Sequence, residues 1–168
     1  MILILLPDNY KNEINRKSGI RLNIRKIKED DLHEILDLYK HLHPNDISLP
    51  LNNTILNIWN EFLQNSLVDI FIGEYDNKII SSCVLAIVPN LTRGARPYGL
   101  IENVITHPNY RKQGFAKSII NYVIEYSKKK NCYKIMLLSS KNRESAHIFY
   151  EKLGFNKNKK FGFVLEFD

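Results

Sequence analysis

The chain has 168 residues, 44% hydrophobic and 25% charged, the balance of one globular domain rather than of a disordered segment. No apolar run approaches the roughly 20 residues that a membrane span requires, and a net charge of +6 favours an anionic ligand without demanding nucleic acid. The two cysteines, Cys83 and Cys132, lack metal-ligand spacing and do not suggest a disulfide scaffold, so the protein is expected to be cytoplasmic.

The domain is expected to begin at residue 20, after an N-terminal extension of residues 1–19. Residues 1–6 are apolar, but they are too few for the core of a signal peptide and no basic residue precedes them. They are interpreted as an edge strand or a packing arm.

Residues 20–88 are predicted to hold three strands and two helices. Apolar residues alternate over 20–27, which predicts a strand, and recur at helical spacing over 32–39 and again over 55–63. Asp30 or Asp31 is expected to cap the first of these helices. Strands are predicted over 68–72 and 79–88, joined through a hairpin turn at the Tyr-Asp-Asn-Lys segment 75–78.

A loop with Gly94 and Pro97 leads into a strand over 98–106. The clearest helix follows over 114–129, where apolar residues recur at i, i+3 and i+4. A strand over 134–139, a short helix over 146–153 ending at Gly154, and a last strand over 161–167 complete the pattern. This order predicts one mixed-sheet domain of the α/β or α+β class.

The start of the helix over 114–129 carries an unusual charge. Three basic residues surround it and no acidic residue lies between positions 102 and 125. Helix N-termini attract anions, so cations there are unfavourable unless an anion sits among them. Gly114 and Ala116 also leave room for an anion to approach the backbone. The segment therefore indicates either a phosphate site or a solvated basic loop, and these observations alone do not choose between them.

Two segments carry a resemblance to a known family. Residues 104–116, Val-Ile-Thr-His-Pro-Asn-Tyr-Arg-Lys-Gln-Gly-Phe-Ala, resemble the acetyl-CoA signature of the GNAT superfamily of N-acetyltransferases: Arg or Gln, two residues, Gly, one residue, then Gly or Ala. Residues 146–155, Ala-His-Ile-Phe-Tyr-Glu-Lys-Leu-Gly-Phe, look like the C-terminal segment of the same family. The resemblance extends from about residue 20 to the end of the chain.

The resemblance implies a single domain over 20–168 with a mostly antiparallel central sheet, a parallel, splayed pair of strands at the cofactor site and about four flanking helices. It implies transfer of an acetyl group from acetyl-CoA to a primary amine of a small molecule or peptide, by direct attack in a ternary complex. No metal, nucleic acid or membrane partner is expected, and a homodimer is left open.

The family resemblance also implies a cofactor site. Backbone amides of residues 111–117 would hold the pyrophosphate, and the end of the preceding strand would pair with the pantetheine arm as an added strand. The implied residues are Val104, Ile105, Thr106, Arg111, Lys112, Gln113, Gly114, Phe115, Ala116 and Lys117. Asn142 is also implied as a ligand, although this chain departs from the family pattern there: the position that often holds asparagine in the family holds Arg143. Asn142 either reaches the coenzyme or caps the helix.

Two side chains are candidates for catalysis. Tyr150 matches the family tyrosine that protonates the departing thiolate, and its alternative role is packing beside Phe149. Glu102 lies in an otherwise apolar strand, where partial burial would suit a base that works near neutral pH. The alternatives are a glutamate paired with a nearby Arg or Lys, or a water chain as the base. The backbone N–H of Val104 or a neighbour would meet the developing oxyanion.

The acceptor side of the site is less defined. The resemblance implies that residues 41–56 shape the acceptor pocket together with the loop before the strand over 98–106. His41, His43 and Asp46 lack a convincing metal-ligand arrangement. Two other functions remain as alternatives: a non-catalytic acyl-CoA-binding module, and a basic nucleic-acid-binding domain, which the position of the basic clusters at turns disfavours.

Overall fold

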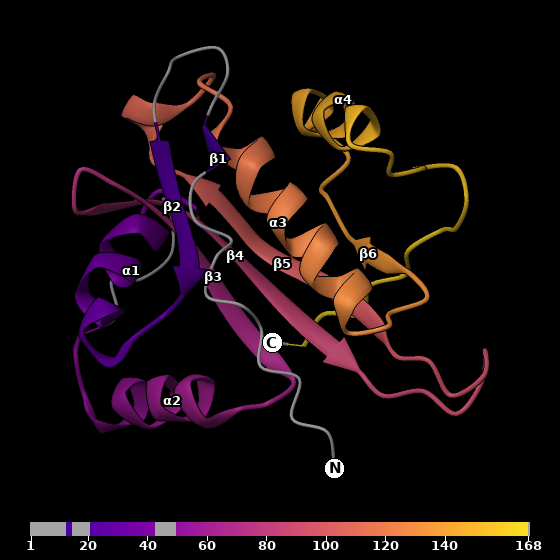
Figure 1. The fold of residues 1–168 in the computed structure, drawn as a ribbon, viewed down its shortest axis with the longest axis horizontal. Coiled ribbons are helices and arrows are strands. Elements are labelled where there is room, and N and C mark those ends of the chain that lie inside the picture. Colours follow the sequence, from indigo (N-terminus) through magenta and orange to yellow (C-terminus); the bar gives the residue numbers. More distant parts are fainter. Residues whose placement is uncertain (1–12, 15–20, 43–49, 168) are drawn as a thin grey trace.

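The computed structural model describes residues 13–14, 21–42 and 50–167. Within them the chain forms six strands, four α-helices and two short 3-10 turns (Figure 1). In chain order these are β1 (Glu13–Ile14), β2 (Arg21–Lys26), η1 (Glu29–Asp31), α1 (Leu32–Tyr39), α2 (Asn53–Gln64), β3 (Val68–Tyr75), β4 (Lys78–Val88), β5 (Tyr98–Thr106), η2 (Pro108–Tyr110), α3 (Phe115–Lys129), β6 (Ile135–Leu137) and α4 (Glu144–Lys152).

The strands lie in one sheet in sequence order, antiparallel from β1 to β5, with β6 parallel to β5. This confirms the predicted mixed sheet with its parallel pair. The β3–β4 hairpin also forms as predicted, because Asp76 and Asn77 adopt left-handed φ angles of 52° and 56°, which a tight hairpin turn requires.

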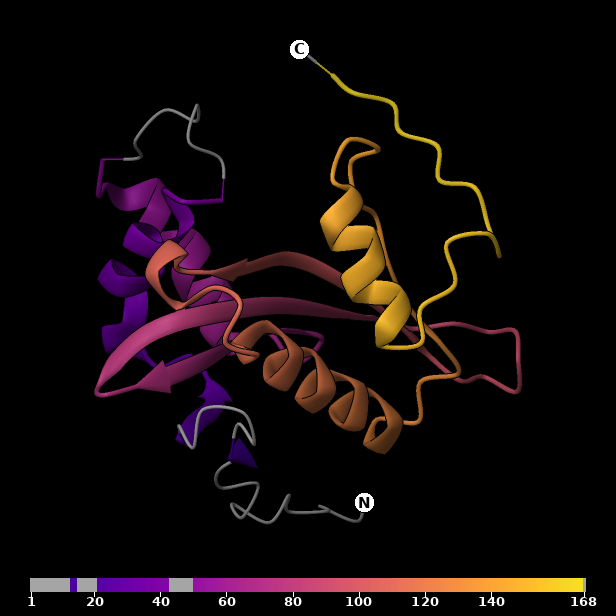
Figure 2. The same ribbon diagram turned by 90° about the horizontal axis from the view of Figure 1, so that it is seen from above.

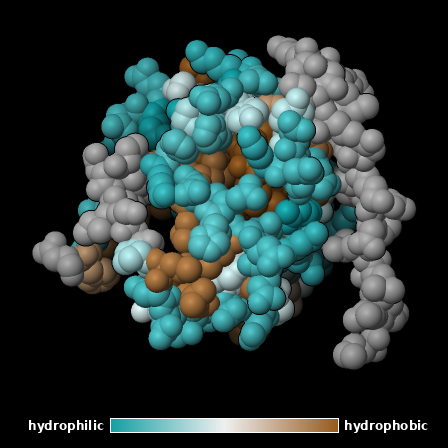
Figure 3. Space-filling view, turned by 90° about the vertical axis from the view of Figure 1, so that its left-hand side faces the viewer, coloured by the Kyte–Doolittle hydropathy of each residue, from teal (hydrophilic) through white to brown (hydrophobic). Residues whose placement is uncertain are grey.

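Helices cover both faces of the sheet. Figure 2 shows α3 on one side and α1 with α2 on the other. Ile119, Ile120 and Val123 of α3 are fully buried against the sheet, whereas Ile35 and Trp59 bury the other face. Seen from the end where α1 and α2 lie, the surface is mostly hydrophilic, with a gathering of hydrophobic side chains (Figure 3). The apolar residues that recur at helical spacing in the sequence are therefore the ones that pack in the core.

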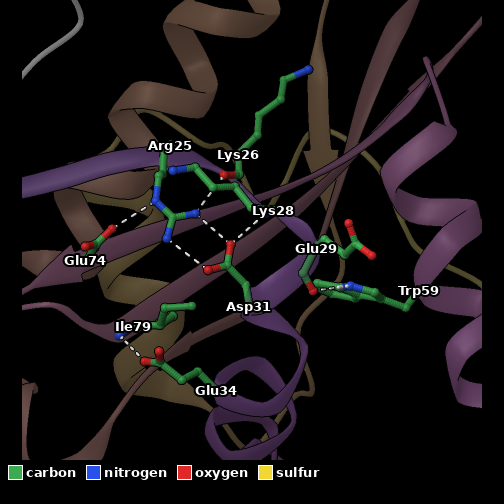
Figure 4. A network of polar contacts seen from close by, with 9 residues as sticks. All are labelled: Arg25, Lys26, Lys28, Glu29, Asp31, Glu34, Trp59, Glu74 and Ile79. Atoms are coloured by element: carbon green, nitrogen blue, oxygen red, sulfur yellow. Dashed lines mark hydrogen bonds and ion pairs between the residues drawn. The ribbon is translucent and has the colours of Figure 1, made fainter.

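A polar network fixes the start of α1 against β2 and β3 (Figure 4). Arg25 donates two hydrogen bonds to the carboxylate of Asp31, at 2.6 and 2.9 Å, and a third at 2.9 Å to Glu74. Asp31 also accepts the backbone N–H of Lys28 at 2.6 Å, a bond that closes the η1 turn. Asp31 stands at the N-cap position of α1, one of the two predicted, but its side chain makes no cap hydrogen bond to that helix. Burial acts to raise the pKa of Asp31, but the bonds from Arg25 and Lys28 outweigh it and the pKa lies below its usual value.

The predicted last strand is wrong for this structure. Residues 161–167 form no strand, and their apolar side chains are exposed. The sequence shows the alternation of a strand, but a strand also needs a hydrogen-bonded neighbour, and this tail leaves the sheet (Figure 2). The preceding strand is shorter than predicted, three residues instead of six. Most of the predicted extension, 1–12 and 15–19, lies outside the described residues; within them, no helix is long and apolar enough to cross a bilayer.

Candidate active site

Strands β5 and β6 diverge in the middle of β5. Their parallel pairing covers Gly99 to Ile101 and goes no further, whereas β5 continues to Thr106 along β4. Among the described residues, no strand therefore pairs with the β6 side of β5 beyond Ile101. The crevice at the carboxyl ends of parallel strands is where such folds bind ligands, and an extended ligand bearing amides can pair with a free strand edge.

A β-bulge lies at the same point. Ser82 pairs with Ile105 and Val84 with Glu102, so Cys83 faces two residues of β5, Asn103 and Val104. Asn103 has a left-handed φ of 49°. A bulge leaves one residue unpaired and redirects the strand, which frees backbone groups for a ligand. The oxyanion donor predicted at Val104 or a neighbour thus falls at an irregular position of β5.

Glu102 occupies the position just before the bulge. The expectation of partial burial is wrong, because the side chain is exposed. It follows the last residue that pairs with β6, so no neighbouring strand covers it. The described lysines and arginines form no ion pair with Glu102, which argues against the alternative of a structural salt bridge.

Tyr150 is partly buried on α4 and packs against Phe149 and Phe155, with ring centroids 5.1 and 5.8 Å apart. Burial raises the pKa of Tyr150, the electrostatic interactions with Cys83 and Glu102 raise it further, and Arg143 lowers it. The phenol therefore keeps its proton at neutral pH and sits within electrostatic range of Glu102. The packing role and a role as an acid are compatible.

The start of α3 has the geometry of an anion site. Gly114 stands before its first residue with φ 90°, no side chain caps the helix, and no acidic residue lies in its first turn. Lys112 has a left-handed φ of 62°. Left-handed residues interspersed in a turn direct successive N–H groups into one concavity, which with the helix dipole attracts phosphate.

Two of the predicted ligands shape this loop through their side chains. The Nε of Arg111 donates to the carbonyl of Thr106 at 3.1 Å, and the amide of Gln113 donates to the carbonyl of Asn109 at 3.3 Å. Both bonds tie the loop to the turn after β5. Arg111 is exposed, so the rest of its guanidinium faces solvent.

The remaining predicted ligands differ in what they can offer. Phe115 and Ile105 are buried, so their side chains belong to the core and only their backbone can serve a ligand. Thr106 shares a hydrogen bond with Ser81, with 2.9 Å between the two hydroxyl oxygens. The surface positions are Lys112 and Lys117, which are exposed, and Ala116, which is partly buried.

Asn142 is exposed in the turn before α4. Its alternative role as the helix cap is wrong, because Arg143 stands at the cap position and no side chain caps the helix. A contact with the coenzyme stays a prediction.

Two residues of this region escaped prediction. Asn103 was passed over, although an asparagine inside an apolar strand favours the left-handed conformation found here. Ser139 follows β6, and its buried hydroxyl finds no hydrogen-bond partner in the described part of the chain. Buried hydroxyls are rarely left unpaired. The open strand edge, the N–H concavity and this hydroxyl fit a ligand with phosphates and an extended amide-bearing arm, as coenzyme A has.

The segment after α1 reaches the same end of β5. The ring of His41 lies edge-on to that of His107, with centroids 4.7 Å apart. Burial, His41 and Arg111 together lower the pKa of His107, which favours its neutral form. His43 and Asp46 lie outside the described residues, and the described ones contain no group of three side chains able to hold a metal.

Comparisons with known proteins agree with this geometry. Residues 31–155 match the model of the Acetyltransferase (GNAT) family. The glucosamine 6-phosphate N-acetyltransferase of Trypanosoma brucei brucei is 36% identical over 143 residues, which cover 84% of this chain and 93% of that protein.

Solved structures show the same likeness. A putative acetyltransferase from Agrobacterium tumefaciens str. C58 has a TM-score of 0.81 and 36% identity, over 86% of this chain and 99% of that one. The glucosamine-6-phosphate N-acetyltransferase from Arabidopsis thaliana shares the fold, with a TM-score of 0.77 and 22% identity over 88% of this chain and 99% of that one. The family match and the relatives at 36% identity show that the chain belongs to the acetyltransferase (GNAT) family.

Proposed function

We propose that this acetyltransferase moves the acetyl group of acetyl-CoA directly to a primary amine, with donor and acceptor bound together. The observation that carries the proposal is the bulge at Asn103, at the point where β5 and β6 diverge. It lies beside Glu102, and the charge of Glu102 acts on Tyr150. This supports a site in which a backbone donor and a carboxylate adjoin each other on β5, with a protonated phenol within electrostatic range of the carboxylate.

The chain's own groups would hold acetyl-CoA at two places. The backbone N–H groups around Gly114 bind the pyrophosphate, and Arg111 keeps their loop in place through its bond to Thr106. The edge of β5 from Val104 to Thr106 pairs with the pantetheine arm. These contacts orient the thioester toward the bulge, and orientation of two bound reactants supplies much of the rate in a direct transfer.

In the proposed reaction the amine nitrogen forms a bond to the acetyl carbon and the carbon–sulfur bond breaks. The Val104 N–H stabilises the negative charge that develops on the acetyl oxygen. Tyr150 gives its proton to the departing thiolate, and Glu102 takes the proton that the nitrogen loses, directly or through water. The products are an N-acetylated amine and coenzyme A with a free thiol.

Glucosamine 6-phosphate is the first acceptor to test. Its support is the relative from Trypanosoma brucei brucei, which is named for this substrate and is 36% identical to this chain. The acceptor would enter from the side of the segment after α1, where His41 meets His107 at the end of β5. A peptide amine is the competing acceptor.

The proposal is tested by mixing the purified protein with acetyl-CoA and single amines: glucosamine 6-phosphate, glucosamine and an unmodified peptide. Free thiol is followed over time, and the N-acetylated product is identified by mass spectrometry. The proposal requires thiol release that depends on an amine. Tight binding of coenzyme A without turnover on any amine would instead support the non-catalytic acyl-CoA-binding module.

A further inference from the structure

The phenol of Tyr39, the last residue of α1, lies against β4 next to the β-bulge. The buried hydroxyl of Ser82 donates a hydrogen bond to the phenol oxygen of Tyr39 at 3.3 Å. Ser82 pairs with Ile105 across β4 and β5, and the bulge follows at the next residue of β4. The ring of Tyr39 packs against the core cluster beneath α1 and α2 and stays partly exposed. This phenol takes no part in the reaction proposed above.

Glu102 projects from the same face of the sheet as Tyr39. It pairs with Val84 across β4 and β5. Directly opposed residues of an antiparallel pair place their side chains on one face. Val84 is buried in the cluster beneath α1 and α2, so Glu102 shares the face that these helices cover (Figure 2). The carboxylate proposed to receive the proton of the amine and the phenol of Tyr39 therefore face the same side.

The two groups are also close along the strands. Ser82 and Val84 are two residues apart on β4, and a strand rises about 3.3 Å per residue. Ser82 sets the level of the Tyr39 phenol and Val84 sets that of Glu102, so the two levels differ by about 7 Å. A small molecule spans such a distance with one polar group at each end. An acceptor whose amine lies at Glu102 therefore has room to place a second polar group at Tyr39.

Tyr39 has a proton to donate. Because the hydroxyl of Ser82 donates to the phenol oxygen, the O–H of Tyr39 needs an acceptor of its own. No residue in the described ranges accepts this proton. Burial raises the pKa of Tyr39, and the bond from Ser82, which lowers it, does not outweigh burial. The phenol is thus a hydrogen-bond donor at neutral pH.

We propose that Tyr39 is a specificity-determining residue, which donates a hydrogen bond to a hydroxyl group of the acceptor and so selects amino alcohols, amino sugars among them, over plain alkyl amines. The inference rests on the proposed function, in which the reacting amine lies at Glu102. Ser82 fixes the phenol, and Tyr39 takes no chemical step. A site with a hydrogen-bonding group for a substrate hydroxyl disfavours an analogue without it, because the group of the site is then left unpaired.

Steady-state rates with two amines of similar ring size test the inference: glucosamine, which has hydroxyls beside its amine, and cyclohexylamine, which has none. Tyr39→Phe keeps the ring and removes only the hydroxyl. Its kcat/KM for glucosamine should fall about tenfold, the value of one hydrogen bond, whereas its kcat/KM for cyclohexylamine should not fall. Each amine is compared between the two enzymes, which cancels the difference in basicity between the amines. The KM for acetyl-CoA should stay unchanged.

Two further variants separate selectivity from catalysis and from folding. Tyr150→Phe removes the acid proposed for the thiolate, which serves every acceptor, so it should lower the rates with both amines by the same factor. Tyr133→Phe changes a tyrosine whose ring packs beside Tyr98, and it should leave both rates unchanged.

Failure of this inference is separable from failure of the proposed function. If Tyr39→Phe loses activity equally with both amines, or with neither, the inference is overturned while acetyl transfer stands. If the wild type acetylates neither amine, calorimetric titration of glucosamine into the protein with coenzyme A decides the inference. Binding about tenfold weaker to Tyr39→Phe than to wild type then supports it, and equal or absent binding overturns it.

Discussion

Tyr150 on α4 lies within electrostatic range of Glu102 on β5. Burial, and then the electrostatic interactions with Cys83 and Glu102, raise the pKa of this tyrosine, while Arg143 lowers it. The two side chains predicted to be catalytic therefore lie within electrostatic range of each other, although they come from different elements. Tyr150 therefore keeps its proton at neutral pH and can donate it, whereas the carboxylate of Glu102 is exposed and can be reached by an incoming amine.

Tyr150→Phe should lower kcat by about 100-fold or more, within the range of general acid catalysis, and leave coenzyme A binding unchanged. In the wild type the active form is the neutral phenol, so activity persists below the raised pKa of Tyr150 and falls only as the pH passes through it. The variant should lose this basic limb. Steady-state rates against pH and calorimetric titration check both points. Tyr133→Phe is the control, and equal rates for Tyr150→Phe and wild type would exclude the acid role.

Glu102→Gln should lower kcat/KM for the amine at neutral pH by about 100-fold if the carboxylate accepts the proton. The deficit should shrink as pH rises toward the pKa of the amine, because a larger share of the acceptor is then already deprotonated. Rates at saturating acetyl-CoA measure this. The control Glu125→Gln removes a carboxylate of α3 that pairs with Lys128 on the surface. A uniform loss at every pH would point to a structural role for Glu102.

Gly114→Val should weaken coenzyme A binding more than Arg111→Ala does. The valine meets a φ of 90° that it tolerates poorly, and its side chain blocks the approach to the N–H groups. Arg111 holds the loop by one hydrogen bond to Thr106, so its loss should cost about tenfold. The control is Lys112→Gly, because glycine adopts the left-handed φ of this position without strain. Normal binding by Gly114→Val would rule out this loop as the pyrophosphate site.

Asn103→Val should lower kcat by about tenfold, because a β-branched residue loses about 1–2 kcal/mol in the left-handed conformation and favours a regular strand. Asn103→Gly accepts the φ of 49° and should keep most of the activity. The comparison separates backbone conformation from any contact made by the asparagine side chain. Equal losses in both variants would assign the effect to the side chain.

Asp31→Asn should lower the free energy of unfolding at pH 7 by about 1.5–3 kcal/mol, the contribution of hydrogen bonds to a charged group. The pKa of Asp31 is lowered in the folded state, so its stabilisation is complete above the unfolded value of about 3.9 and is lost as pH falls through the folded pKa. Asp31→Asn should not show this loss of stability at acid pH. Urea unfolding at several pH values measures it. The control Asp37→Asn, at an exposed pair with Lys40, should leave stability unchanged.

The sequence predicts well the elements that local pattern determines. The helix α3 follows from its apolar spacing, and the β3–β4 turn follows from Asp76 and Asn77, residues that accept left-handed angles. The basic loop before α3 is found because its charges conflict with a helix N-terminus. Each of these features is encoded in neighbouring residues.

Features that depend on distant partners were not predictable in the same way. The exposure of Glu102 follows from the point where β6 stops pairing, and the tail over 161–167 has the alternation of a strand without a neighbour in its own chain. The bulge at Asn103 depends on how β4 and β5 pair across it. Alternation identifies a strand, but it does not tell which strand will cover its edge.

A crystal structure of the protein with coenzyme A tests the central claim most directly. The account predicts the pyrophosphate against the N–H groups around Gly114, the pantetheine arm paired with β5 from Val104 to Thr106, and the sulfur near Tyr150. Coenzyme A bound away from the crevice between β5 and β6, or with its sulfur remote from both Tyr150 and the bulge at Asn103, would contradict it.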